Sequence, residues 1–249
     1  MENNEINNLI GKNKIIDIST KELFDVLSSK VLFEARWGFS KGNLTDEEYK
    51  SIIENKAKPA LEKLKKQEET SPLIECKAVY AYFEAKSEGN KIIINNCEFE
   101  FPRQEKEPYL CIADFIKNNT SKIIPFFVVT IGSKIIEAEK KLFEENAYYD
   151  YHLLHGLGAE MADCAAVCVH RKICCELFKE TYDKKDKPLG CRYSFGYPSC
   201  PDLAYQKKLF ELLNPSRIGV TLTESYQMVP EFSVSGFILF NNKARYFVP

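Results

Sequence analysis

Apolar residues recur at helical spacing in five stretches of the chain. The first begins after Ser19 or Thr20, either of which suits a helix N-cap, and keeps one apolar face as far as Arg36. The second begins at Thr45, which is followed by three acidic residues typical of the first turn of a helix. The spacing therefore predicts helices over residues 20–36, 45–69, 133–146, 148–182 and 204–213.

Other stretches have the patterns of β-strands. Residues 78–84 alternate loosely, and residues 123–131 form a continuous apolar run, as expected of a strand buried on both faces. We expect Pro125 near the start of that strand, because proline has no N–H to donate. Strand-like runs also cover 91–101, 217–223, 233–240 and 243–248, a short helix or strand end covers 109–116, and 187–202 is predicted to be a loop.

The order of these elements favours a single domain. Residues 1–18 are a polar lead-in rich in Asn and Lys, and residues 19–249 contain no internal repeat or low-complexity linker. We therefore predict one domain over 19–249 that carries both helices and strands.

Composition excludes several classes of protein. The 34 basic and 36 acidic residues give a net charge of −2, which argues against nucleic acid as the main partner. No apolar run approaches the roughly 20 residues that cross a bilayer, and the acidic start Met1–Glu5 is unlike a signal peptide. The nine cysteines are then expected to be reduced thiols of a cytoplasmic protein.

Several motifs that would indicate a metal, nucleotide or hydrolase site are incomplete or absent. The segment Asp150–His155 has His155 where the cobalt-binding pattern Asp-x-His-x-x-Gly requires glycine. Cys164 and Cys168 lie one helical turn apart, but the chain lacks the tight Cys-x-x-Cys pairs of structural zinc sites, so we expect buried thiols and no metal. The chain also lacks Gly-x-Gly-x-x-Gly, Walker and Gly-x-Ser-x-Gly motifs.

The informative segment is Gly190–Asp202, which is dense in Gly, Pro, Cys and Tyr. Its prolines restrict the backbone, and Gly196 permits a close approach of the main chain to a ligand. Arg192 offers a planar fork that suits a carboxylate, and Tyr197 offers a ring face with a polar tip. The segment suits an anionic, ring-bearing small molecule, although a stiff surface loop with Arg192 in an ordinary ion pair explains the composition equally well.

A set of ordered motifs decides between these alternatives. Arg-x-x-x-Gly-Tyr-Pro-x-Cys-Pro from Arg192 to Pro201 is followed by Leu-Thr-Glu-Ser, Met-x-Pro, Ser-Val-Ser-Gly and Arg-Tyr-Phe, and is preceded by Cys-Ile-Ala-Asp-Phe-Ile at 111–116. Together they resemble the activation domain of cobalamin-dependent methionine synthase, over residues from about 20 to 248. The resemblance implies an α+β fold, a twisted antiparallel sheet flanked by helices, with a site for S-adenosylmethionine (AdoMet).

The resemblance also implies roles for individual residues. Asp114 and Asp163 would meet the amino group or ribose of AdoMet, and Arg192 would hold its carboxylate. Asp163 stands where the family usually has Glu, so either affinity is reduced or Glu160, one turn earlier, takes part. The other implied binding positions are the main chain near Ser194 and Gly196, and the side chains of Tyr197, Tyr246 and Phe247. No residue is assigned a catalytic or metal-binding role.

The implied function is reactivation of oxidised cobalamin. An electron from a flavodoxin-like donor, coupled to methyl transfer from AdoMet, would restore methylcobalamin, while the chain positions the sulfonium methyl group. Cobalamin would come only through a partner, a methionine synthase that lacks its own activation domain. The chain would act as a stand-alone protein if Met1 is the native start, and otherwise it would be an excised domain. The alternatives are a non-catalytic AdoMet-binding interaction module and an activator of another corrinoid methyltransferase.

Overall fold

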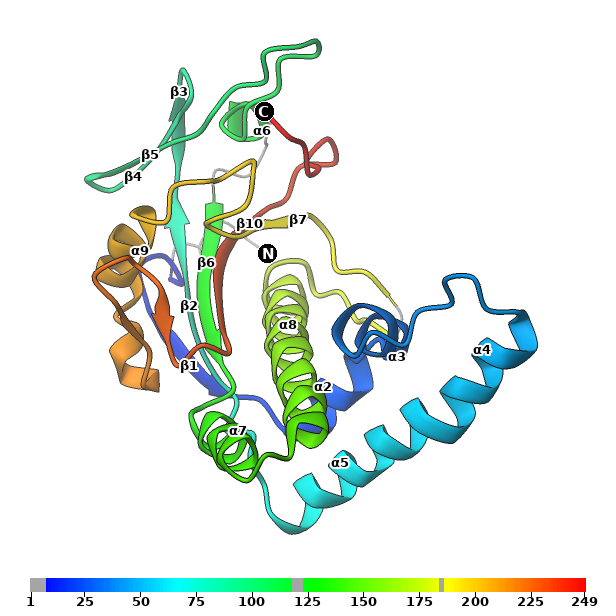
Figure 1. Cartoon of the computed structure of the whole chain (residues 1–249). Helices are drawn as coiled ribbons and strands as arrows, with labels where there is room; N and C mark the ends of the chain where they lie inside the picture. Colours follow the sequence, from blue (N-terminus) through cyan, green and yellow to red (C-terminus); the bar gives the residue numbers. More distant parts are fainter. Residues whose placement is uncertain (1–7, 118–122, 184–185) are drawn as a thin grey trace.

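An antiparallel sheet of five strands, in the order β1-β2-β6-β10-β7, forms the centre of the computed structural model, which describes residues 8–117, 123–183 and 186–249 (Figure 1). Helices flank this sheet, in agreement with the predicted α+β class. The strands are β1 (Lys14–Asp17), β2 (Lys77–Glu84), β6 (Ile123–Thr130), β7 (Cys191–Tyr193) and β10 (Ser233–Leu239), and every neighbouring pair is antiparallel.

The central strands are buried on both faces. Tyr80 of β2 and Phe127 of β6 belong to the core on one face, and Val79 and Phe126, their neighbours in sequence, belong to the core on the other. This double burial explains why β6 is apolar at nearly every position rather than at alternate ones. Pro125 is the third residue of β6 and precedes the segment that pairs with β10, as predicted.

Helices cover one face of the sheet, and a mixed layer covers the other (Figure 1). The first layer contains α2 (Thr20–Val26), α7 (Lys134–Glu144) and the long α8 (Tyr148–Phe178). The second layer contains α6 (Asp114–Lys117), α9 (Tyr205–Leu213) and a small sheet of β3 (Lys86–Glu88), β4 (Lys91–Ile94) and β5 (Cys97–Glu100). The predicted helices over 133–146, 148–182 and 204–213 are thus present, with α8 ending four residues early.

Helix α8 makes unusually close contacts at two glycines. A Cβ atom on Gly156 would lie 2.6 Å from the Trp37 ring, and one on Gly158 would lie 2.7 Å from the Phe232 ring. The Trp37 indole N–H donates to the carbonyl of Leu153 at 2.9 Å. Glycine normally weakens a helix interior, but here it lets two aromatic rings lie directly on the helix backbone.

The N-terminal part of the chain differs from the prediction in two respects. Residues 14–17, which were assigned to the polar lead-in, form edge strand β1, while residues 1–7 of that lead-in lie outside the described residues. The predicted helix over 20–36 is broken into α2, α3 (Ser29–Val31) and a wider π-type turn (Leu32–Arg36). The break occurs because the Ser28 hydroxyl accepts from the Val31 N–H at 3.3 Å and begins a new helix.

The predicted helix over 45–69 is confirmed as a long arm. It consists of α4 (Asp46–Ile52), a π-type turn (Ile53–Ala57) and α5 (Lys58–Thr70), and its outer end extends away from the sheet (Figure 1). Thr45 caps it in a reciprocal arrangement with Glu48: each side chain accepts a hydrogen bond from the other's backbone N–H.

The C-terminal part also contains corrections. The predicted strand over 217–223 is a 3₁₀ turn (Pro215–Ile218) followed by β8 (Thr221–Leu222), which pairs with β9 (Met228–Val229). The predicted strand over 243–248 is irregular, and the predicted loop over 187–202 contains β7. Residues 109–116 contain only the start of α6. Within the described residues, no helix is long and apolar enough to cross a membrane.

Candidate functional site

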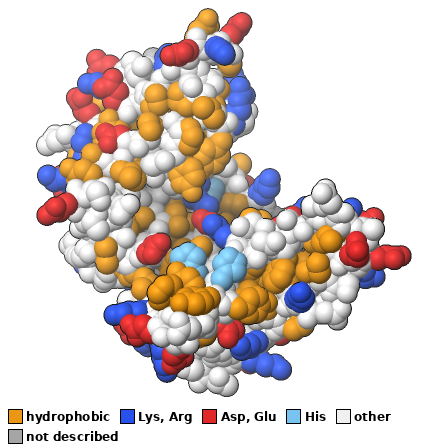
Figure 2. All heavy atoms as spheres, viewed as in Figure 1, with side chains coloured by type: hydrophobic (Ala, Val, Ile, Leu, Met, Phe, Trp, Pro, Cys, Tyr) orange, Lys and Arg blue, Asp and Glu red, His pale blue; other side chains and the backbone are white. Residues whose placement is uncertain are grey.

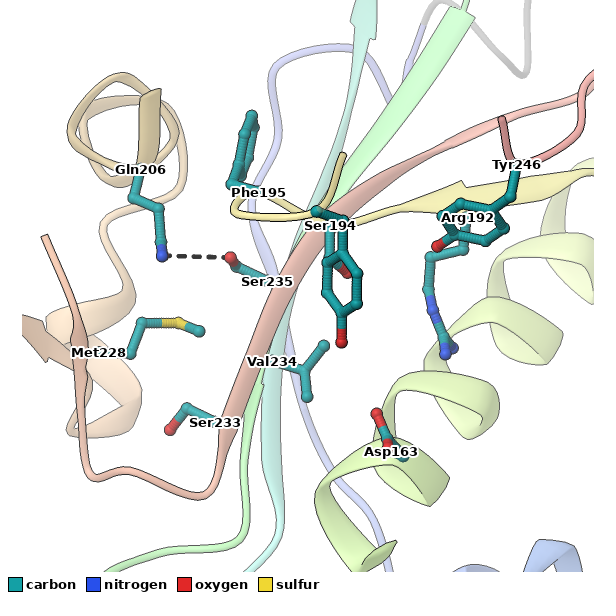
Figure 3. Close-up of a pocket in the computed structure, with 11 residues that line it drawn as sticks. Asp163, Arg192, Ser194, Phe195, Gln206, Met228, Ser233, Val234, Ser235 and Tyr246 are labelled. Carbon is teal, nitrogen blue, oxygen red and sulfur yellow. Dashed lines mark hydrogen bonds between the residues drawn. The ribbon is translucent and has the colours of Figure 1, made fainter. Parts of the chain in front are cut away.

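A groove of about 500 Å³ opens where β7, β10 and α8 meet (Figure 3). In the space-filling view, the molecule is hollowed between the helical arm and the part that carries the sheet, and charged and apolar side chains share the walls of the hollow (Figure 2). Five residues singled out from the sequence line the groove: Asp163, Arg192, Ser194, Tyr197 and Tyr246.

Strand β7 positions Arg192 through its pairing with β10, in which Arg192 lies opposite Ile238. The two strands approach closely at Gly236, where a Cβ atom would lie only 2.3 Å from the carbonyl oxygen of Tyr193. Any other residue at 236 would force β7 outward. Glycine at this position therefore sets the place from which the Arg192 side chain enters the groove.

A tight turn follows β7. Gly196 has a φ of +91°, a conformation that favours glycine, and its N–H donates to the carbonyl of Cys200 at 2.8 Å. The Ser199 hydroxyl donates to the carbonyl of Phe247 at 2.6 Å, which ties the turn to the C-terminal segment. Gly196 lies between two residues that line the groove, Phe195 and Tyr197, but does not line it itself.

Arg192 and Asp163 bring opposite charges into the same groove. Figure 3 shows the Arg192 side chain reaching from β7 toward α8, where Asp163 points into the same groove. Within residues 8–117, 123–183 and 186–249, the Arg192 guanidinium has no hydrogen bond or ion pair with the protein. The ordinary surface ion pair, which was the alternative explanation of the loop composition, is therefore not present among these residues.

Asp163 is itself held by a residue that the sequence analysis missed. Nη2 of Arg36 lies 2.5 Å from Oδ2 of Asp163, and Nε of the same guanidinium lies 3.2 Å from Oε2 of Glu160. Glu160 is buried and does not line the groove, and its burial raises the pKa of its carboxyl. The geometry thus places Asp163, rather than Glu160, at the groove surface.

Two of the residues expected at the site lie elsewhere. Asp114 forms a bidentate ion pair with Arg103, at 2.6 and 2.9 Å, and accepts from the Cys111 N–H at 3.0 Å. The Phe247 ring packs against Phe115, with ring centroids 6.3 Å apart. Neither lines the groove. The binding roles expected for Asp114 and Phe247 remain predictions, and so do those of the groove residues.

The remaining lining residues were not assigned from the sequence. Ser235 donates to Oε1 of Gln206 at 3.1 Å, and both side chains are buried (Figure 3). The motifs Met-x-Pro and Ser-Val-Ser-Gly contain four of these positions, but the motifs did not show which side chains face the groove. The residues that complete the lining are Phe195, Gln206, Met228, Ser233, Val234 and Ser235.

The nine cysteines and His170 are buried or half-buried. In the part of the chain that the structure describes, no group of three His, Cys, Asp or Glu residues is arranged to hold a metal ion. Burial raises the pKa of the Cys164 thiol, and that of Cys168 to about 12, so both are protonated at neutral pH. His170 is buried against the carbonyl of Leu189 at 2.8 Å, and its burial lowers its pKa to about 4.

Comparisons with known proteins agree on one family. The family model described as "Vitamin B12 dependent methionine synthase, activation domain" matches residues 21–248. Methionine synthase of Mycobacterium tuberculosis (strain ATCC 25618 / H37Rv) is 34% identical over 270 residues, and that of Mycobacterium leprae (strain TN) is 32% identical over 269 residues. Each alignment covers 95% of this chain, which spans only 22% of the length of each relative.

A solved structure shows the same fold. The crystal structure of the MetH reactivation domain bound to AdoHcy superposes with a TM-score of 0.78 at 22% sequence identity, and the match covers 95% of this chain and 81% of that one. The resemblance read from the sequence motifs and the α+β fold class are both confirmed.

Proposed function

The chain belongs to the family of activation domains of vitamin B12-dependent methionine synthase, and we propose that it binds AdoMet in its groove and supports the reductive methylation of cob(II)alamin. AdoHcy, the ligand of the structural neighbour, is AdoMet without its transferred methyl group. The groove in this chain has the size of a small-molecule site and carries charged and aromatic side chains.

One observation carries the proposal: Arg192 and Asp163 face the same groove from different elements. The methionine end of AdoMet bears a carboxylate and an ammonium group. Arg192 suits the carboxylate because its planar guanidinium makes two parallel hydrogen bonds, and it has no competing partner among the described residues. Asp163 suits the ammonium group. Tyr197 and Tyr246 supply ring faces for the adenosine.

The role of the chain in the reaction is to bind and orient. In this reaction, an electron from a flavodoxin-like donor would reduce cob(II)alamin, and the methyl group of AdoMet would pass to the reduced cobalt. S-adenosylhomocysteine would be the second product. Holding the head group at Arg192 and Asp163 fixes the direction of the sulfonium methyl relative to a docked partner. No proton transfer is required of the protein, so the function needs no acid–base residue in the groove.

We assign the cobalamin to a partner, a cobalamin-dependent methionine synthase that lacks its own activation domain. The 249 residues contain no Asp-x-His-x-x-Gly motif with which to ligate cobalt. We expect the reaction to take place in the cytoplasm, where the nine cysteines stay reduced.

Isothermal titration calorimetry with AdoMet tests the binding step. We expect one molecule per chain, and we expect Arg192→Ala to weaken affinity by about tenfold or more, since a charge-assisted hydrogen bond contributes about 1.5–3 kcal/mol. Arg192→Lys should recover only part of this loss because it lacks the fork. Arg217→Ala, an exposed arginine outside the groove, is the matched control and should bind normally. Absence of binding at several hundred micromolar AdoMet would refute the proposal.

A reactivation assay tests the function beyond binding. The chain is mixed with a methionine synthase truncated of its activation domain, reduced flavodoxin and AdoMet labelled in its methyl group. We expect labelled methylcobalamin to form only when the chain is present. Normal AdoMet binding without any methyl transfer, to this or another corrinoid protein, would instead identify a non-catalytic interaction module.

A further inference from the structure

Three charged side chains form a connected cluster at one wall of the groove. Arg36, from the turn after α3, contacts both Asp163 and Glu160, which are three residues apart on α8. The Asp163 side chain is 44% exposed and lines the groove, whereas that of Glu160 is 7% exposed and lies behind it. Arg36 is thus shared between a carboxylate that faces the groove and one that does not.

The net charge of this cluster depends on Glu160. With both carboxylates ionised, the cluster carries one net negative charge. If Glu160 were neutral, Arg36 and Asp163 would cancel each other, and the groove wall would lose its attraction for a cation. Charges this close interact appreciably even at a partly exposed site. Burial raises the pKa of Glu160, and its ion pair with Arg36 opposes that effect.

The backbone of Arg36 is held close to α8. The adjacent Trp37 is buried and donates its indole N–H to the carbonyl of Leu153 on α8 at 2.9 Å. A Cβ atom on Gly156 would lie 3.2 Å from Cβ of Arg36, which shows how closely this turn lies on the helix. With its backbone held there and its own ion pair to Asp163, we expect Arg36 to stay beside Asp163 when Glu160 is neutral.

We propose that Glu160 is a specificity-determining positioning residue, which neutralises Arg36 so that Asp163 keeps its charge for the ammonium group of the ligand. The inference rests on the proposed function and extends it to a residue that does not touch the ligand. It predicts that the charge of Glu160 governs selectivity for ligands that carry an α-amino group.

The test compares two ligands in three proteins by isothermal titration calorimetry. The ligands are S-adenosylhomocysteine and its analogue in which hydrogen replaces the α-amino group. The proteins are the wild type, Glu160→Gln and the double variant Arg36→Met/Glu160→Gln. In Glu160→Gln we expect the amino ligand to bind about three- to tenfold more weakly, while the deaminated analogue changes less than twofold. The double variant restores a net charge of −1 and should recover affinity for the amino ligand.

The ratio of the two affinities is an internal control, because partial unfolding weakens both ligands alike. Glu176→Gln replaces a glutamate of the same helix that pairs with Lys14 and does not line the groove, and it should leave the ratio unchanged. An equal loss for both ligands in Glu160→Gln, no loss for either, or no recovery in the double variant would overturn the inference while the proposed function stands. A wild type that binds neither ligand would overturn both.

Discussion

Protonation of the buried His170 should destabilise the fold as the pH falls. His170 is 4% exposed, and its Nε2–H donates to the carbonyl of Leu189, just before β7. Burial, with a smaller contribution from the nearby charge of Arg192, lowers its pKa from 6.5 to about 4. A charged imidazole would lose hydration, and its hydrogen bond to Leu189 offsets only part of that cost.

The sign and size of the effect follow from that pKa. Above pH 6.5 the imidazole is neutral in both the folded and the unfolded chain, so it contributes no pH dependence. Between 6.5 and about 4 the unfolded chain binds the proton and the folded chain does not, so the free energy of unfolding falls as the pH falls. The full loss is on the order of 3 kcal/mol, of which roughly 2 kcal/mol is reached by pH 5.

Urea denaturation at pH 7 and pH 5 measures this loss. Other groups titrate in the same range, so the quantity of interest is the difference between the wild type and His170→Gln, whose amide N–H can donate to Leu189 in place of Nε2. We expect His170→Gln to lose about 2 kcal/mol less than the wild type between the two pH values. His152→Gln, which changes an exposed histidine of the same helix, should behave like the wild type. Equal losses in all three proteins would refute the argument.

Three further predictions concern the groove and the cysteines. Gly236→Ala should lower both the melting temperature and AdoMet affinity, because its Cβ would lie 2.3 Å from the Tyr193 carbonyl oxygen and push β7 outward; an unchanged affinity would show that the position of β7 is unimportant. Asp163→Glu should tighten AdoMet binding a few-fold at unchanged stability, as the longer side chain reaches further into the groove; weaker binding in calorimetry would contradict this. Elemental analysis of the purified protein should find no stoichiometric metal, and about one zinc per chain would contradict the prediction that Cys164 and Cys168 are metal-free thiols.

The sequence predicted the long, strongly patterned elements and missed the short ones. The apolar run of β6 and the helical spacing of α8 are clear in the sequence, because each element is buried along most of its length and burial requires apolar residues there. The edge strand β1 has only four residues and one neighbouring strand, so little of its pattern is constrained by burial. The break at Ser28 is decided by a single hydroxyl cap, which competes with an otherwise continuous helical spacing.

At the candidate site, sequence motifs identified the residues on and after β7 but missed Arg36, which contacts Asp163 on α8. Arg192 and Tyr197 belong to a single short motif, so their proximity follows from the chain itself. Arg36 lies more than a hundred residues from Glu160 and Asp163, and no local pattern indicates that tertiary packing brings them together. Asp114 belongs to a motif that was recognised in the sequence, but its carboxylate is paired with Arg103 outside the groove.

The orientation of the ligand head group is the central claim, and a crystal structure of the protein with S-adenosylhomocysteine measures it directly. We predict that the ligand carboxylate lies within hydrogen-bonding distance of the Arg192 guanidinium, with the ammonium group directed to Asp163 and the adenosine beside Tyr197 or Tyr246. A ligand bound outside this groove, or bound within it with its carboxylate away from Arg192, would contradict the account.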